Sequence, residues 1–112
     1  MSSRLKTYLA HLSKEGGRSL GRFVIGNSSV DYDSFFGSII LAYLLTTAAG
    51  KLYQPIIDCS KEDLRLRFEI MATLERAKID PEGLLFRESS EAYPKGEYSL
   101  YDHNERELEA KV

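Results

Sequence analysis

The sequence predicts an α/β fold, with a mainly parallel sheet of about four strands and flanking helices. Four short apolar segments have the length and composition of strands, at residues 21–25, 52–57, 84–86 and 98–101. Helical patterns precede the first of these segments and separate the first three. A helix between consecutive strands returns the chain to the same end of the sheet, so those strands should run parallel. The length of 112 residues suits one modest domain.

The N-terminal segment predicts an amphipathic helix. Its apolar residues recur at helical spacing, namely Leu5, Tyr8, Leu9 and Leu12. Residues 15–17 (Glu-Gly-Gly) follow them as a stop signal, and residues 21–25 then read as a buried strand.

Residues 34–48 form a very apolar segment that predicts the second helix, ending before Gly50. The segment is apolar on nearly every side, so we expect it to be buried on more than one face. Gly37 and Ser38 interrupt its apolar run, which falls short of the roughly 20 residues that a membrane-spanning helix needs. We therefore expect no membrane span.

The second strand contains Pro55, which lacks the N–H that a central ladder position uses. We expect an edge or strand-end position for it. Ser60, followed by acidic residues, has the arrangement of a capping box and predicts a third helix that ends near Lys78. A polar loop at residues 89–96 then separates the last two strands, and the charged tail from residue 105 should begin as a helix.

Composition and charge exclude some classes of function. The formal net charge of -2 implies no general attraction to nucleic acid or to an anionic membrane. The single cysteine, Cys59, cannot form an internal disulfide and is consistent with the cytoplasm or another reducing intracellular compartment. Its position after a strand predicts a small buried side chain.

Two aspartates follow the first strand. Asp31 and Asp33 lie two positions apart, with Tyr32 between them, and in an extended loop their side chains would point the same way. Carboxylates at the carboxyl end of a strand predict a site for a hard divalent cation. The alternative is that Asp31, Asp33 and Ser34 cap the following helix, and the two roles can coexist.

The fourth strand leads into Asp102, His103 and Asn104, which offer a carboxylate, an imidazole and an amide. Taken alone, this triplet is a weak signal and would more often be a surface turn. Both polar segments follow strands of a predicted parallel sheet, so they should emerge at the same edge of it.

These segments resemble the DHH phosphoesterase superfamily, and within it the exopolyphosphatase and prune-like branch. The resemblance covers most of the chain and passes through residues 26–34, 61–69 and 102–104. The middle stretch is the least generic, because that branch typically begins a helix with an acid-Leu-x-Leu-Arg pattern, here at residues 63–67. Arg65 and Arg67 lie on different faces of this helix, where we expect solvated or ion-paired roles.

The resemblance implies two divalent metal ions, Mn²⁺ or Mg²⁺, and a catalytic set of Asp31, Asp33, His103 and Asn104. Asp31 looks like a ligand of one metal, with Asn27 near it, and Asp33 and His103 look like ligands of the other. Asn104 stands where many relatives have a histidine that contacts the phosphoryl group. Such a pair of metals lowers the pKa of a bridging water for attack on a phosphoanhydride.

Two departures from the family pattern stand out. The aspartate that bridges both metals is replaced by Glu88, which has one more methylene, is a possible metal ligand and is equally consistent with a solvated loop acid. A fourth motif and the smaller C-terminal substrate-binding domain are not found before Val112. Residues 1–112 therefore read as the N-terminal part of a DHH phosphoesterase domain, an incomplete DHH-type domain.

Two hypotheses follow. The first is a metal-dependent hydrolase of exopolyphosphatase type, acting on inorganic polyphosphate or another small phosphoanhydride. The second is a non-catalytic fragment or paralogue that keeps a phosphate-binding or partner-binding surface. The sequence does not indicate the oligomeric state, although an open sheet edge would favour association.

Overall fold

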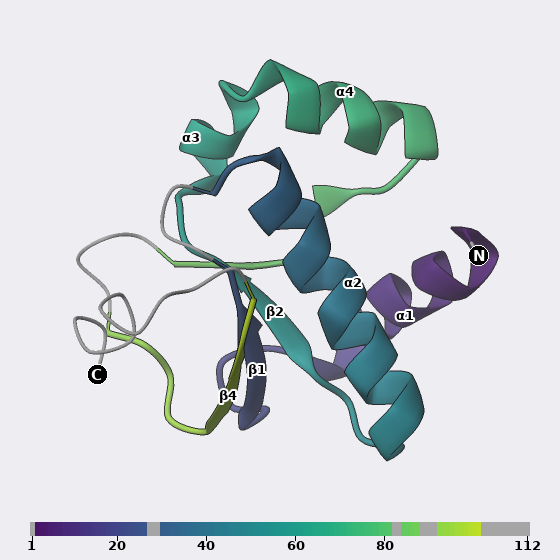
Figure 1. Cartoon of the computed structure of the whole chain (residues 1–112), viewed down its shortest axis with the longest axis vertical. Helices are drawn as coiled ribbons and strands as arrows, with labels where there is room; N and C mark the ends of the chain where they lie inside the picture. Colours follow the sequence, from purple (N-terminus) through teal and green to yellow (C-terminus); the bar gives the residue numbers. More distant parts are fainter. Residues whose placement is uncertain (1, 27–29, 82–83, 88–91, 102–112) are drawn as a thin grey trace.

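The computed structural model describes residues 2–26, 30–81, 84–87 and 92–101. Its centre is a four-stranded sheet in the order β3-β2-β1-β4, with every neighbouring pair parallel. The strands are β1 (Arg22–Ile25), β2 (Gln54–Ile57), β3 (Leu85–Phe86) and β4 (Glu97–Leu100). The predicted fold class is confirmed (Figure 1).

Four helices accompany the sheet in the described part of the chain: α1 (Ser2–Glu15), α2 (Tyr32–Ala49), α3 (Lys61–Arg65) and α4 (Phe68–Ala77). The structure has two helices where the sequence predicts one over residues 60–78. Ser60 caps α3 as predicted, since its side chain accepts a hydrogen bond from the Asp63 N–H. The backbone then leaves the helical region at Arg67, with φ -94° and ψ 88°, and α4 begins afresh.

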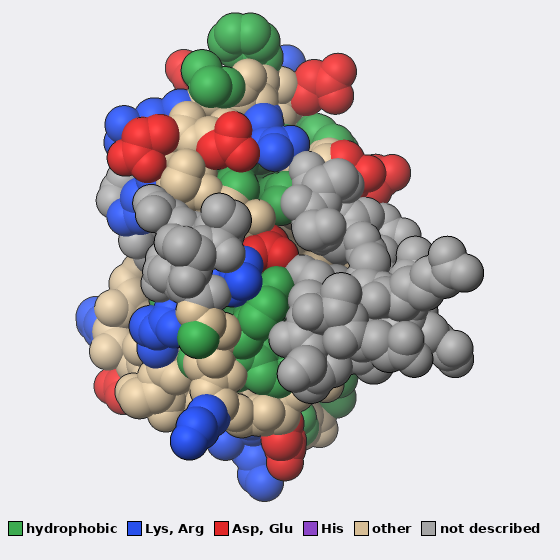
Figure 2. Space-filling view, turned by 90° about the vertical axis from the view of Figure 1, so that its left-hand side faces the viewer, with side chains coloured by type: hydrophobic (Ala, Val, Ile, Leu, Met, Phe, Trp, Pro, Cys, Tyr) green, Lys and Arg blue, Asp and Glu red, His purple; other side chains and the backbone are tan. Residues whose placement is uncertain are grey.

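One face of the sheet packs against the helices. Val24 and Ile57 share a buried cluster with side chains from α1, α2 and α4. Successive residues of a strand point to opposite faces, so Phe23, Ile25 and Ile56 form a second cluster on the other side. Tyr93 and Tyr98 pack onto that second cluster, and no described helix does. Figure 2 views the molecule from the left-hand side of Figure 1. Apolar side chains are visible on this surface among charged ones.

The prediction that α2 is buried on more than one face is only partly right. Phe35, Ile39 and Ala42 are buried, whereas Ile40 and Leu44 are 41% and 51% exposed. In the described part of the chain, α2 is the one helix long and apolar enough to cross a membrane by length and composition. α2 packs against the sheet, and helices that pack in a protein core meet the same criteria of length and composition.

Pro55 does not lie at a sheet edge, because β2 is an interior strand between β1 and β3. The strand-end part of the prediction holds. Pro55 is the second residue of β2, and the pairing with β3 begins one residue later, at Ile56. A proline is thus accommodated where the ladder on one side has not yet started. Cys59, two residues beyond β2, is buried as predicted.

Gln54 begins β2 and is 1% exposed. Its Oε1 accepts a hydrogen bond from the Gly17 N–H at 3.0 Å, and its Nε2 donates to the Pro55 carbonyl at 3.0 Å. The side chain therefore ties the turn after α1 to the sheet.

We expect Gln54→Leu to lower the free energy of unfolding by about 1–3 kcal/mol, because it leaves the Gly17 N–H without its acceptor. Urea denaturation followed by circular dichroism measures this loss. An unchanged midpoint would mean that water replaces the amide at this position.

Candidate active site

The carboxyl ends of β1 and β4 lie side by side. Ile25 is paired with Leu100, and the Tyr101 N–H donates to the Ile25 carbonyl at 3.0 Å. The chain passes from β1 to β2 on one side, whereas β4 lies on the other side of β1. Ligands of open α/β sheets bind at such a point, where the strand order reverses. Both polar segments predicted from the sequence begin at this place.

Gly26 directly follows β1 and lets α2 come close to the sheet. A Cβ atom at this position would lie 2.3 Å from the Ser34 Oγ and 3.0 Å from the Ser34 carbonyl oxygen. No other residue type leaves room for so close an approach of the first turn of α2. Gly26 therefore sets where the N-terminus of α2 lies relative to the end of β1.

Asp31 caps α2. Its Oδ1 accepts a hydrogen bond from the Ser34 N–H at 2.9 Å, and its side chain is exposed. The capping alternative is thus confirmed for Asp31, and solvent access leaves the carboxylate able to contact a cation as well. Asp33 is also exposed, but it lies in the first turn of α2 rather than in an extended loop. The extended geometry expected for the pair is wrong, because capping by Asp31 starts the helix at Tyr32.

Gly37, on α2, lies against Tyr101, the residue that directly follows β4. A Cβ atom on Gly37 would lie 2.2 Å from two ring atoms of Tyr101, so the Tyr101 ring rests on α2 at this point. Residues four apart lie on the same face of a helix, which places Asp33 on the face that Tyr101 covers. The chain continues from Tyr101 directly into Asp102. Asp33 is therefore on the side of α2 that faces the end of β4.

We expect Gly37→Val to lower the free energy of unfolding by about 1–3 kcal/mol, because the added side chain must displace the Tyr101 ring. Thermal unfolding measures the change. The same substitution in a Tyr101→Ala background should cost clearly less, since the ring is gone. Equal costs in the two backgrounds would contradict the contact.

The other predicted site residues, Asn27, Glu88, His103 and Asn104, lie outside the described residues. Each directly follows, or lies close after, a described strand end. Within the described ranges no three acidic, histidine or cysteine side chains come together as a metal site. Asp31 and Asp33 suit a hard divalent cation by chemistry, although two carboxylates are too few to complete its ligands.

Sequence reasoning missed Asp58, which follows β2 at the same edge. Its carboxylate is 6% exposed and accepts hydrogen bonds from Arg87 Nη1 at 2.6 Å and from the Tyr93 hydroxyl at 2.8 Å. The Arg87 guanidinium lies 3.8 Å from the centre of the Tyr93 ring. Arg87 immediately precedes Glu88 in the sequence, so this cluster fixes the last described residue before Glu88. The available signal was an acid directly after a buried strand, the same signal that identified Asp31.

Arg67 forms the predicted ion pair, with its Nη2 3.3 Å from an oxygen of Asp63. It also donates to the Val30 carbonyl at 3.0 Å, a contact that the sequence pattern did not indicate.

A hollow of about 510 Å³ lies at the opposite end of the strands. Gln54, Leu84 and Gly16 line it together with Lys6 and Lys78. A smaller hollow of about 240 Å³ lies beside Asp31 and is lined by Val30, Arg67 and Glu69. Size alone therefore does not identify the site, since the paired carboxylates lie at the other edge.

Comparison with known proteins gives related sequences. A Schizosaccharomyces pombe protein whose name describes it as an exopolyphosphatase is 36% identical over 87 residues, which are 73% of this chain and 23% of that protein. Exopolyphosphatase PRUNE1 of Homo sapiens is 31% identical over 88 residues, 72% of this chain and 19% of the relative. The chain has a prune-like N-terminal region of the DHH phosphoesterase family.

The matched region is short relative to these family members. PRUNE1 of Rattus norvegicus is 31% identical over 67 residues, which are 58% of this chain and 15% of that protein. The chain thus spans less than a quarter of the length of the S. pombe relative and about a fifth of the human one. No family model matches the chain, and no solved structure was found to match it.

Proposed function

We propose that this prune-like region forms the carboxylate side of a two-metal phosphohydrolase site of exopolyphosphatase type. The observation that carries the proposal is the position of Asp31 and Asp33. Both are exposed at the N-terminus of α2, beside the adjacent carboxyl ends of β1 and β4. The relatives named exopolyphosphatase support the choice of reaction class. In this proposal residues 1–112 are the N-terminal part of a DHH phosphoesterase domain.

The proposed ligands divide between two divalent ions, Mn²⁺ or Mg²⁺. Asp31, with Asn27 near it, would hold one ion, and Asp33 and His103 would hold the other. Glu88 would bridge them, and Asn104 would contact the phosphoryl group. When bound, such a metal pair supplies a water of lowered pKa and offsets phosphoryl charge.

The described residues contribute orientation to this site. Asp31 is fixed by its hydrogen bond to the Ser34 N–H, and Asp33 is fixed by its place in the first turn of α2. The Asp58 and Arg87 pair holds the end of β3, and Tyr101 on Gly37 holds the end of β4. A carboxylate that is already oriented loses less freedom when it binds a cation.

The proposed substrate is inorganic polyphosphate or another small phosphoanhydride, in the cytoplasm or another reducing compartment. The test measures phosphate release from polyphosphate by the purified chain with Mn²⁺, with Mg²⁺ and with a chelator. Release should require the metal and should coincide with the chain on a sizing column. Background release under all three conditions would contradict catalysis by this chain.

A non-catalytic function is the second candidate. The replacement of the bridging aspartate by Glu88 favours it, because one extra methylene changes the spacing between two bridged metals. Such a chain would keep a phosphate-binding surface at the same edge of the sheet. Polyphosphate binding without phosphate release, measured by titration calorimetry, would distinguish it from the enzyme.

A further inference from the structure

Val30, directly before Asp31, has a strained backbone. Its φ is 50°, in the left-handed region that β-branched residues rarely adopt. Its side chain is only 3% exposed and belongs to the main core cluster. Such strain persists only where surrounding contacts hold it, and it is often found at functional sites.

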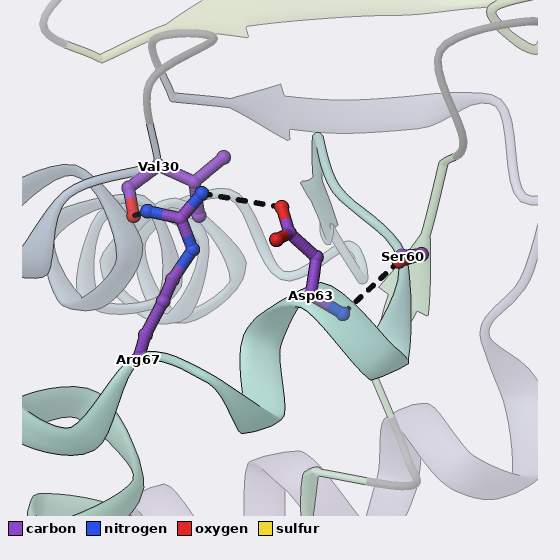
Figure 3. A network of polar contacts seen from close by, with 4 residues as sticks. All are labelled: Val30, Ser60, Asp63 and Arg67. Carbon is purple, nitrogen blue, oxygen red and sulfur yellow. Dashed lines mark hydrogen bonds and ion pairs between the residues drawn. The ribbon is translucent and has the colours of Figure 1, made fainter.

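Arg67 is one of these contacts. Its Nη1 donates to the Val30 carbonyl at 3.0 Å, while its Nη2 pairs with Asp63 at 3.3 Å (Figure 3). Asp63 is itself placed by the Ser60 cap of α3, through an N–H···Oγ hydrogen bond of 3.1 Å. The guanidinium therefore links the cap of one helix to the backbone that delivers Asp31.

The residue after Asp31 is held by the same part of the fold. The hydroxyl of Tyr32 shares a hydrogen bond of 3.0 Å with that of Thr73 on α4. Arg67 is the N-cap residue of α4, so both chain neighbours of Asp31 are attached to one helix. Asp31 thus has fixed backbone on each side, with its own carboxylate exposed between them.

We propose that Arg67 is a positioning residue, which holds Val30 in its left-handed conformation and thereby orients the Asp31 carboxylate for cation binding. The inference rests on the proposed function for the identity of the cation. We call the hydrogen bond between Arg67 and the Val30 carbonyl the clamp, and it is present in the chain without metal. An ion pair between partly exposed side chains contributes little by itself, so the bond to the Val30 carbonyl is the part that matters.

The clamp can be tested without metal through the Ser34 amide, which is protected by Asp31 when the cap is formed. In Arg67→Ala, hydrogen exchange at Ser34 should accelerate about tenfold, the effect of losing one hydrogen bond to a charged group. In Arg67→Lys the ammonium group can donate to the Val30 carbonyl, but it cannot bind Val30 and Asp63 through two separate nitrogens as arginine does. This variant should therefore restore part of the protection of the Ser34 amide. Arg65→Ala is the matched control, because it removes the same charge two residues away and should leave Ser34 unchanged.

Manganese titration of the same variants gives the second reading. The affinity for Mn²⁺ should fall about tenfold in Arg67→Ala, partly recover in Arg67→Lys and be unchanged in Arg65→Ala. Unchanged exchange at Ser34, or equal acceleration at the core amides of β1, would overturn the positioning role. Local acceleration at Ser34 in a chain whose wild type binds no Mn²⁺ would overturn the proposed function and leave the clamp standing. Local acceleration with unaltered Mn²⁺ affinity would overturn the link between the clamp and the metal.

Discussion

Asp33→Ala is expected to reduce metal-dependent phosphate release by at least about a hundredfold. Loss of a residue that only supports a metal ligand costs up to about a hundredfold, and Asp33 is proposed to be a ligand itself. Asp33 carries a carboxylate on the face of α2 that Tyr101 covers, and alanine there removes a charge that the proposed second metal needs. Phosphate release from polyphosphate with Mn²⁺ measures the effect. The variant should stay folded, because an exposed acid in the first turn of a helix contributes only about 0.3–1 kcal/mol.

Asp80→Ala is the matched control for this experiment. Asp80 borders the hollow at the opposite end of the strands, so its removal takes away the same charge without reaching the site. Release by Asp80→Ala should equal that of the unaltered chain. Equal release by Asp33→Ala and the unaltered chain would sink the proposed role of Asp33. Asp31→Ala is a less clean test, because it also removes the helix cap at Ser34.

The strands, their parallel direction and most of the helices could be predicted because the relevant signals are local. Short apolar segments separated by helical patterns predict parallel strands, and all three strand pairings are parallel. The end of α2 at Gly50 also follows from a local signal, since Gly50 adopts φ 69° there. Local sequence patterns were therefore sufficient to predict most of the fold.

The errors in the predicted fold arise from contacts between distant residues. The division between α3 and α4 falls at Arg67, whose side-chain partner Val30 lies 37 residues earlier. The helical pattern of residues 60–78 continues through that point, so periodicity could not reveal the break. Pro55 was expected at an edge or strand end because its missing N–H is a local fact, whereas the later start of pairing with β3 is a property of the sheet.

The candidate site shows the same division. Asp31 and Asp33 could be found from their spacing after a strand, and the structure places both at the edge where β1 and β4 end. The orientation of Asp33 could not be found, because it depends on where the Asp31 cap starts the helix. Asp58 was missed because Arg87 and Tyr93, its partners, lie 29 and 35 residues away in the sequence.

Asp58→Ala should have the largest effect on stability, a loss of about 3–5 kcal/mol in the free energy of unfolding. The Asp58 and Arg87 side chains are only 6% and 14% exposed. Removal of the carboxylate leaves the guanidinium buried without its counter-charge and the Tyr93 hydroxyl without its acceptor. A domain of this size is stable by about 5–15 kcal/mol, so the variant should be close to unfolding at 37 °C. Urea denaturation at 25 °C measures the loss.

Asp63→Ala provides the comparison for Asp58→Ala, because it removes the same group from a pair whose side chains are 32% and 52% exposed. Its cost should be at most about 1 kcal/mol, as for other ion pairs in contact with water. A double variant, Asp58→Leu with Arg87→Met, should recover much of the loss, because it removes both charges and keeps apolar volume. Equal costs for Asp58→Ala and Asp63→Ala would mean that water reaches the Asp58 and Arg87 pair. Recovery in the double variant would instead attribute the loss to the stranded guanidinium, and so to the contact that holds the end of β3 before Glu88.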